Sequence, residues 1–196
     1  MFNRKRRFVL STLILFAVLA TNFLAACAPQ TATNIPTDSC GPIEPSDKDV
    51  QYALSFGTDL FNTAKWVKSY TVEPYKVSVS RHNDTEGSVA YLEYLMYNCG
   101  YNQTDLNNYF NDAGFNVVFG DYDTHKLAHF CEIKSLALYE YDLVSKGENY
   151  FARYWVKQDS GTRVLVVMLV FPTDSQGTMD RYTKQLFPQL TSCPNS

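Results

Sequence analysis

The chain has 196 residues, of which 17 are basic and 20 are acidic, so its formal net charge at pH 7 is −3. Outside the first few residues it has no basic patch, which argues against nucleic acid or anionic lipid surfaces as partners. The length suits one domain with a substantial core.

The first 26 residues have the composition of an export signal. A basic block, Asn3–Arg7, precedes an apolar run from Phe8 to Leu24. As a helix this run would span roughly 26 Å at about 1.5 Å per residue, which is short for a bilayer core of about 30 Å. A basic start, a short apolar run and small residues before a cleavage position are typical of a secretory signal peptide rather than a permanent membrane span.

The apolar run ends in Leu24-Ala25-Ala26-Cys27, which resembles the lipobox of bacterial lipoproteins. The resemblance implies cleavage before Cys27, a lipid on the Cys27 sulfur and usually acylation of the new amino terminus. Two or three acyl chains hold a protein firmly on a membrane that it does not span. We therefore expect an extracytoplasmic protein anchored to the outer face of the cytoplasmic membrane or to the outer membrane. The alternative is an ordinary signal or anchor helix that contains a chance cysteine.

Cleavage would leave 170 residues with 13 basic and 20 acidic side chains, a formal charge of −7. Residues 27–46 contain four prolines and few apolar residues, which predicts an extended tether rather than a helix or strand. Residues 47–196 are expected to form the globular domain.

Lipidation of Cys27 would leave four cysteines, Cys40, Cys99, Cys131 and Cys193, without the close spacing of zinc or redox motifs. Outside the cytoplasm, four separated cysteines are typical of two disulfides. Three pairings are possible. We favour Cys99–Cys131, which would join a helix end to a strand, and Cys40–Cys193, which would join the two ends of the domain.

The remainder of the chain is rich in predicted strands. Ser46-Asp47 offers a helix cap, and further helices are expected over 87–99, over 104–112 and from Met179 toward Leu190. Strands are expected over 66–72, 75–81, 116–122, 126–134, 136–144, 150–157 and 163–171. The last of these is apolar on both faces, which predicts a central strand covered on both sides. The sequence therefore predicts a single α+β domain, with a mainly antiparallel sheet of about five to seven strands and helices packed against it.

One candidate ligand-binding surface is the predicted helix over 87–99. There Tyr91, Tyr94 and Tyr97 would lie opposite the apolar stripe, with Tyr101 just beyond the helix. Tyrosine combines a flat apolar ring with a polar tip, which suits a surface that binds sugars or a protein. The alternative is that the tether, a loop or the next helix covers these rings.

A candidate metal or acid/base site lies in the stretch from Gly120 to His129. If this stretch is extended, Asp121, Asp123 and His125 share one face. The alternative is a polar turn between two strands. The common signatures of serine hydrolases, zinc proteases, dinucleotide-binding proteins and P-loop proteins do not occur, and no cofactor is expected.

These observations favour a lipid-anchored, non-enzymatic binding or interaction module of the cell envelope, with an envelope protein or a glycan as partner. One alternative is a small envelope hydrolase or metal-dependent enzyme that uses Asp121, Asp123 and His125. A second alternative is a structural envelope protein without a ligand.

Overall fold

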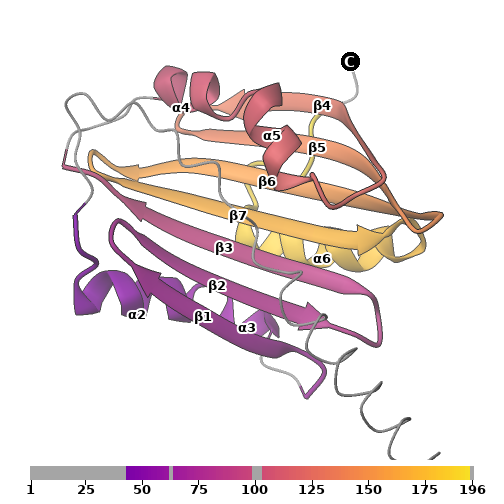
Figure 1. Cartoon of the computed structure of the whole chain (residues 1–196), viewed down its shortest axis with the longest axis horizontal. Coiled ribbons are helices and arrows are strands. Elements are labelled where there is room, and N and C mark those ends of the chain that lie inside the picture. Colours follow the sequence, from indigo (N-terminus) through magenta and orange to yellow (C-terminus); the bar gives the residue numbers. More distant parts are fainter. Residues whose placement is uncertain (1–42, 62–63, 99–102, 195–196) are drawn as a thin grey trace, which may run out of the picture. The chain divides into compact units, whose positions relative to one another are not determined.

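The computed structural model describes residues 43–61, 64–98 and 103–194, so the predicted signal peptide, the lipobox-like motif and most of the predicted tether lie outside the described residues (Figure 1). One seven-stranded antiparallel sheet dominates the described part of the chain. Its strands are β1 (Val67–Glu73), β2 (Lys76–Asn83), β3 (Ser88–Met96), β4 (Thr124–Ile133), β5 (Leu136–Ser145), β6 (Glu148–Ser160) and β7 (Arg163–Pro172). The predicted α+β class and antiparallel sheet are thereby confirmed. Among the described helices, none is long and apolar enough to cross a bilayer.

The sheet consists of two meanders joined in its middle. Strands β1 to β3 follow one another, strands β4 to β7 do the same, and β7 pairs with β3 to give the order β1-β2-β3-β7-β6-β5-β4. Short turns set the registers. The β5–β6 turn places Lys146 (φ 52°) and Gly147 (φ 81°) in the left-handed region, the pattern of a tight two-residue hairpin. Strands β1 and β4 are therefore the two edges of the sheet.

Helices cover both faces of the sheet (Figure 1). Helices α2 (Asp47–Ser55), α3 (Thr58–Phe61) and α6 (Gln176–Leu186) contribute to one core cluster, and α4 (Gln103–Tyr109) and α5 (Asp112–Val118) contribute to the other. Strand β7 lies in the middle and supplies Leu165 and Val167 to the first cluster and Val164 and Val166 to the second. The prediction of a central strand covered on both sides is confirmed.

The start of the domain follows the predicted cap. The Ser46 hydroxyl oxygen accepts a hydrogen bond from the Asp49 amide, and the Asp49 carboxylate accepts one from the Ser46 amide, which is a capping box at the first turn of α2. Asp49 also accepts hydrogen bonds from Arg163 at 2.8 and 3.1 Å, which join α2 to the beginning of β7.

Two predicted elements are wrong. Residues 88–96 form strand β3 rather than a helix, and residues 116–118, expected in a strand, belong to helix α5. Both faces of β3 are covered, so apolar residues occur on both sides of the strand and imitate a helical stripe. Helix α5 begins because the Asn111 side chain accepts hydrogen bonds from the amides of Ala113 and Gly114.

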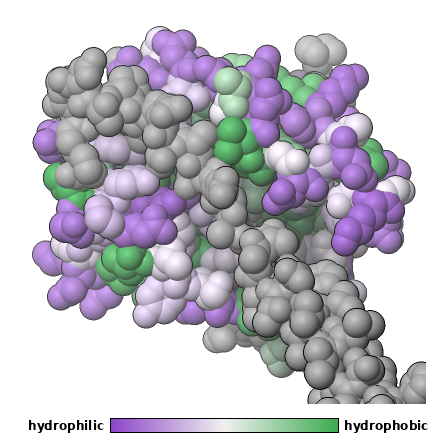
Figure 2. Space-filling view, in the orientation of Figure 1, coloured by the Kyte–Doolittle hydropathy of each residue, from purple (hydrophilic) through white to green (hydrophobic). Residues whose placement is uncertain are grey.

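The surface on the side of α4 and α5 is largely polar. Figure 2 shows apolar residues on this side as separate patches among polar ones. Scattered apolar residues of this kind are ordinary on a folded domain.

Candidate functional site

A pocket of about 470 Å³ lies between helix α6, the segment after it and strands β4 to β6. Its charged or titratable lining residues are His129, Glu140, Asp142, Arg153, Asp180 and Lys184. The aromatic ring of Phe151 also lines it, and the Arg153 guanidinium lies over that ring at 5.5 Å from its centre. Polar side chains that converge beside an aromatic ring can orient a ligand in a concave site.

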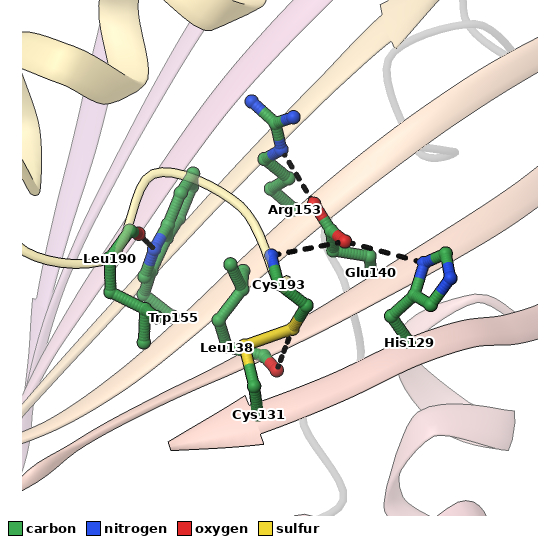
Figure 3. Close-up of a disulfide and its surroundings, with 8 residues drawn as sticks. All are labelled: His129, Cys131, Leu138, Glu140, Arg153, Trp155, Leu190 and Cys193. Atoms are coloured by element: carbon green, nitrogen blue, oxygen red, sulfur yellow. Dashed lines mark hydrogen bonds and ion pairs between the residues drawn. A yellow bond between two sulfur atoms is a disulfide. The ribbon is translucent and has the colours of Figure 1, made fainter. Parts of the chain in front are cut away.

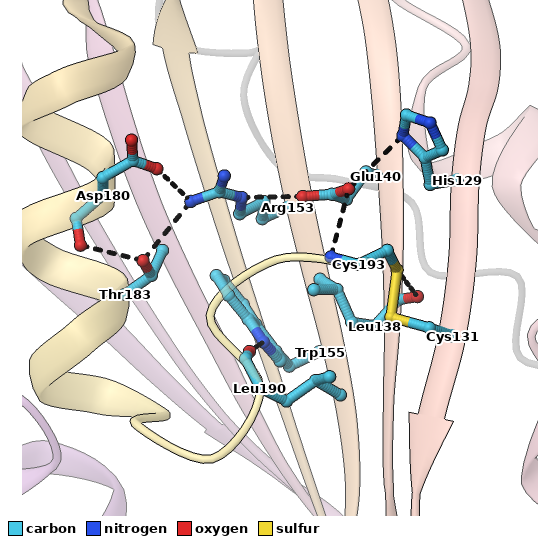
Figure 4. Close-up of polar contacts among 10 residues, drawn as sticks. All are labelled: His129, Cys131, Leu138, Glu140, Arg153, Trp155, Asp180, Thr183, Leu190 and Cys193. Atoms are coloured by element: carbon cyan, nitrogen blue, oxygen red, sulfur yellow. Dashed lines mark hydrogen bonds and ion pairs between the residues drawn. A yellow bond between two sulfur atoms is a disulfide. The ribbon is translucent and has the colours of Figure 1, made fainter. Parts of the chain in front are cut away.

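A buried ion pair forms the base of this pocket (Figure 4). Glu140 and Arg153 lie directly opposite each other on β5 and β6, and Arg153 Nε donates to Glu140 Oε1 at 2.9 Å. Both side chains are almost fully buried. Removing either partner of such a pair would leave an uncompensated buried charge, which typically costs about 3–5 kcal/mol of folding free energy.

Helix α6 holds the other side of the guanidinium. Arg153 Nη1 donates to Asp180 Oδ1 at 2.6 Å and to Thr183 Oγ1 at 3.3 Å. The remaining nitrogen, Nη2, makes no hydrogen bond with any described residue, and in Figure 4 it points away from both carboxylates. The result is an arginine that is only 3% exposed, fixed in orientation and still able to donate.

The second carboxylate oxygen of Glu140 faces strand β4 and the C-terminal segment. Oε2 lies 3.5 Å from Nδ1 of His129, its direct neighbour on β4, and accepts a long hydrogen bond of 3.4 Å from the Cys193 amide. The register between β4 and β5 shifts between Leu127 and His129. Glu140 is therefore engaged from β4, from β6 and from the C-terminal segment.

A disulfide fastens that C-terminal segment to the sheet (Figure 3). Cys193 is bonded to Cys131 on β4, with their Cα atoms 5.6 Å apart. Close by, Trp155 Nε1 donates to the Leu190 carbonyl at 2.9 Å, and the Trp155 ring stacks on Phe187. These contacts hold residues 187–193 over β5 and β6 and so complete one wall of the pocket.

This bond contradicts both of the favoured cysteine pairings, because Cys131 and Cys193 are the partners. Strand β3, which ends three residues before Cys99, is separated from β4 by three strands. At about 4.8 Å per strand the two are roughly 19 Å apart, far beyond the reach of a disulfide between them. Cys40 and Cys99 lie outside the described residues, as does Cys27.

The predicted tyrosine surface is also wrong. Because residues 88–96 are a strand, Tyr91 points to one face of the sheet and Tyr94 to the other. Tyr94 and Tyr97 are only 6% and 4% exposed, and Tyr91 is partly buried. The Tyr94 hydroxyl donates a hydrogen bond of 3.0 Å to Asp159 Oδ2, and burial together with this carboxylate raises the pKa of Tyr94. Tyr101 lies outside the described residues.

The structure does not gather Asp121, Asp123 and His125 into a site. Asp123 Oδ2 accepts a hydrogen bond of 2.6 Å from the Lys146 amide in the β5–β6 turn. His125 Nε2 lies 2.8 Å from Asn116 Oδ1, and Asp121 is exposed in the turn before β4. Within residues 43–61, 64–98 and 103–194, no group of three or more His, Cys, Asp or Glu side chains could hold a metal ion.

Sequence reasoning missed Glu140 and Arg153, although a signal for them exists. Each is a charge inside a run of apolar and aromatic residues, "LALYEYDLV" and "FARYWVK". Once Lys146-Gly147 is recognised as the hairpin turn, the register places Glu140 opposite Arg153. A buried charge opposite a buried charge of the other sign is the expected pattern of an ion pair.

No protein-family model and no curated protein matches the chain. A crystal structure of PA94 from Pseudomonas aeruginosa, a protein of unknown function, has a similar arrangement over 67% of this chain and 100% of that chain. The identity is 12% and the TM-score is 0.38. A likeness of this size supports no inference about function.

Proposed function

We propose that this chain is a lipid-anchored, non-enzymatic binding module on the outer side of a bacterial membrane, and that its pocket binds a hydroxyl-rich ligand such as a glycan. The resemblance of Leu24–Cys27 to a lipobox supports the anchor. The Cys131–Cys193 disulfide supports an oxidising compartment, because disulfides persist outside the cytoplasm and are rare within it.

The observation that carries the ligand assignment is the Arg153 guanidinium. It is held by Glu140 and Asp180 and keeps Nη2 unpaired among the described residues. Since those two carboxylates already neutralise its charge, Nη2 suits a neutral acceptor better than an anion. A hydroxyl or carbonyl oxygen of a ligand would meet this requirement.

The charge of the whole lining agrees with a ligand that is not anionic. Three carboxylates, those of Glu140, Asp142 and Asp180, oppose the cations Arg153 and Lys184. Asp142 is exposed and makes no ion pair with any described residue, so it is free to accept a hydrogen bond. Hydroxyl groups donate and accept at once, and so match neighbouring carboxylate acceptors and cationic donors.

The experiment is a binding titration of the mature, detergent-solubilised protein with neutral, amino and acidic oligosaccharides. We expect neutral or amino oligosaccharides to bind and acidic ones to bind more weakly. Asp142→Ala and Lys184→Gln should each weaken binding by roughly 10-fold, because a hydrogen bond to a charged group contributes about 1.5 kcal/mol or more. Both side chains are exposed, so the variants should remain folded.

Arg181→Gln is the matched control, because Arg181 lies on the same helix and does not line the pocket. It should bind like the unmodified protein. Absence of binding to every oligosaccharide, or equal binding by the Asp142, Lys184 and Arg181 variants, would contradict the ligand assignment.

A further inference from the structure

Strand β1 is an open edge of the sheet. All seven of its residues, Val67–Glu73, are exposed, and within the described chain it pairs only with β2. Three of its apolar side chains, Val67, Tyr70 and Val72, are 53%, 54% and 48% exposed. An edge of this kind presents unpaired backbone donors and acceptors that can accept another strand.

The other edge, β4, carries the features that commonly block such pairing. Its register shifts at Leu127/His129, the disulfide at Cys131 holds the C-terminal segment against it, and the Asn107 side chain from α4 bonds to its Glu132. By contrast, β1 keeps an unbroken register with β2 over its whole length. The two edges differ, therefore, in protection as well as in position.

We propose that two copies of this chain associate through β1, antiparallel and related by a two-fold axis at Thr71. In this register Tyr70 faces Val72 of the partner subunit, Val72 faces Tyr70 of the partner subunit, and Thr71 faces Thr71 of the partner subunit. The two sheets would become one continuous sheet across the axis. Such an isologous contact is closed and does not propagate into fibres.

The side chains of β1 favour this register. Tyr70 lies opposite Val79 and Val72 opposite Val77 on β2, so both point to the face of the sheet that α2 covers. Pairing across the axis keeps them on that face, where aromatic and β-branched side chains make favourable cross-strand pairs. On the opposite face the pairing places two threonines together, which is another favourable pair.

Charge supports the antiparallel direction. Lys68 lies near one end of β1 and Glu73 at the other. In the proposed antiparallel register Glu73 faces Ser69 of the partner subunit, so no two like charges face each other, whereas parallel in-register association would place Lys68 beside Lys68 and Glu73 beside Glu73. One strand pair is a small contact, and confinement by the proposed lipid anchor would raise the local concentration and favour it.

Thr71→Cys tests the contact directly in the full, lipidated protein reconstituted into vesicles. Residues that face each other on antiparallel strands have Cα atoms about 4.5–5.5 Å apart, which is within disulfide range. Mild oxidation should give a cross-linked dimer on a non-reducing gel. Ser69→Cys is the matched control, since it lies on the same face and would be roughly 14 Å from its counterpart, four residues away along the strand at about 3.4 Å per residue.

We expect Thr71→Cys to cross-link at least 10-fold faster than Ser69→Cys. Adding Val72→Lys to each cysteine variant should abolish the difference between their rates. Equal rates for the two cysteines, or faster linking of Ser69→Cys, would overturn the proposed contact. Adding lipid at constant bulk protein tests the anchor separately. If the protein is anchored, the cross-linking rate of Thr71→Cys should fall as added lipid lowers the surface density of the protein. A rate that does not change with the lipid-to-protein ratio, but is still higher for Thr71→Cys than for Ser69→Cys, would support the contact and contradict the anchor.

Discussion

The two ends of the sheet are built in different ways. At the β4 end, the Cys131–Cys193 disulfide, the Trp155–Leu190 hydrogen bond and the contacts of Arg153 with Glu140 and Asp180 tie the C-terminal segment, α6 and three strands together. At the β1 end none of the described helices or segments covers the edge, and every residue of β1 is exposed. The cross-linked end encloses the pocket, where fixed side-chain positions favour ligand binding. The open end is suited to adding a strand.

Removing the disulfide should have the largest effect on this contrast. Cys131→Ala with Cys193→Ala opens a loop of 62 residues, and the chain-entropy model assigns such a loop about 4 kcal/mol of unfolding free energy. Urea unfolding of the mature protein in detergent measures the loss. Ser192→Ala, at an exposed neighbour of Cys193, should change the stability by less than about 0.5 kcal/mol. A loss below about 1 kcal/mol in the double variant would contradict the structural importance of the disulfide.

Breaking the buried ion pair should have the next largest effect. Arg153→Met leaves Glu140 buried without its cation and should lower the unfolding free energy by about 3 kcal/mol. The double variant Glu140→Leu with Arg153→Met removes both charges and should recover most of the loss, because the desolvation cost disappears with them. A double-mutant cycle in urea measures the coupling. Additive losses in the two single variants would show that the pair is not coupled.

In the half of the domain that contains β1 to β3, the ion pair between Asp49 and Arg163 holds helix α2 against the sheet, and no disulfide takes part in this contact. Burial alone would raise the pKa of Asp49, but hydrogen bonds from Arg163 and Ser46 outweigh it and lower the pKa to about 2. Because the folded pKa lies below the ordinary value of 3.8, the contribution is present above about pH 4 and is lost as the pH falls toward 2. The lowered pKa of Asp49 contributes about 2 kcal/mol to the unfolding free energy.

Unfolding free energies measured between pH 6 and pH 2 test this anchor. Asp49→Asn should reduce stability at pH 6 and flatten the acid part of the profile, and the two proteins should converge near pH 2. A variant that keeps the acid slope of the unmodified protein would show that another carboxylate is responsible.

The smallest expected effect is on stability, from substitutions in the turn before β4, and the same variants test the predicted metal site. Asp123→Ala removes the hydrogen bond to the Lys146 amide and should cost about 1 kcal/mol. Asp121→Ala should cost almost nothing, because Asp121 is exposed in the same turn. Thermal unfolding with and without Zn²⁺ measures both effects. A metal-dependent rise in melting temperature that both substitutions abolish would restore the metal site.

The predictable parts of the fold are those in which local chemistry and tertiary setting agree. Ser46 begins a helix, Lys146-Gly147 turns a hairpin, and the apolar run 163–171 becomes the central strand β7. The failures occur where the tertiary setting dominates. Strand β3 is covered on both faces, so its sequence lacks the alternation of apolar and polar residues that identifies a half-exposed strand.

The pocket was less predictable than the fold because it depends on contacts between distant segments. The hairpin register alone would have placed Glu140 opposite Arg153. The C-terminal segment crosses β5 and β6. This path brings Asp180 of α6 to Arg153 and places Cys193 beside Cys131. Such a path has no local signal in the sequence.

Mass spectrometry of the protein purified from its native membrane tests the central claim most directly. We predict a chain that begins at Cys27 with acyl chains on it, and a cross-linked peptide that joins Cys131 to Cys193. A chain that retains residues 1–26 with an unmodified Cys27 thiol, or free thiols at Cys131 and Cys193, would contradict the account.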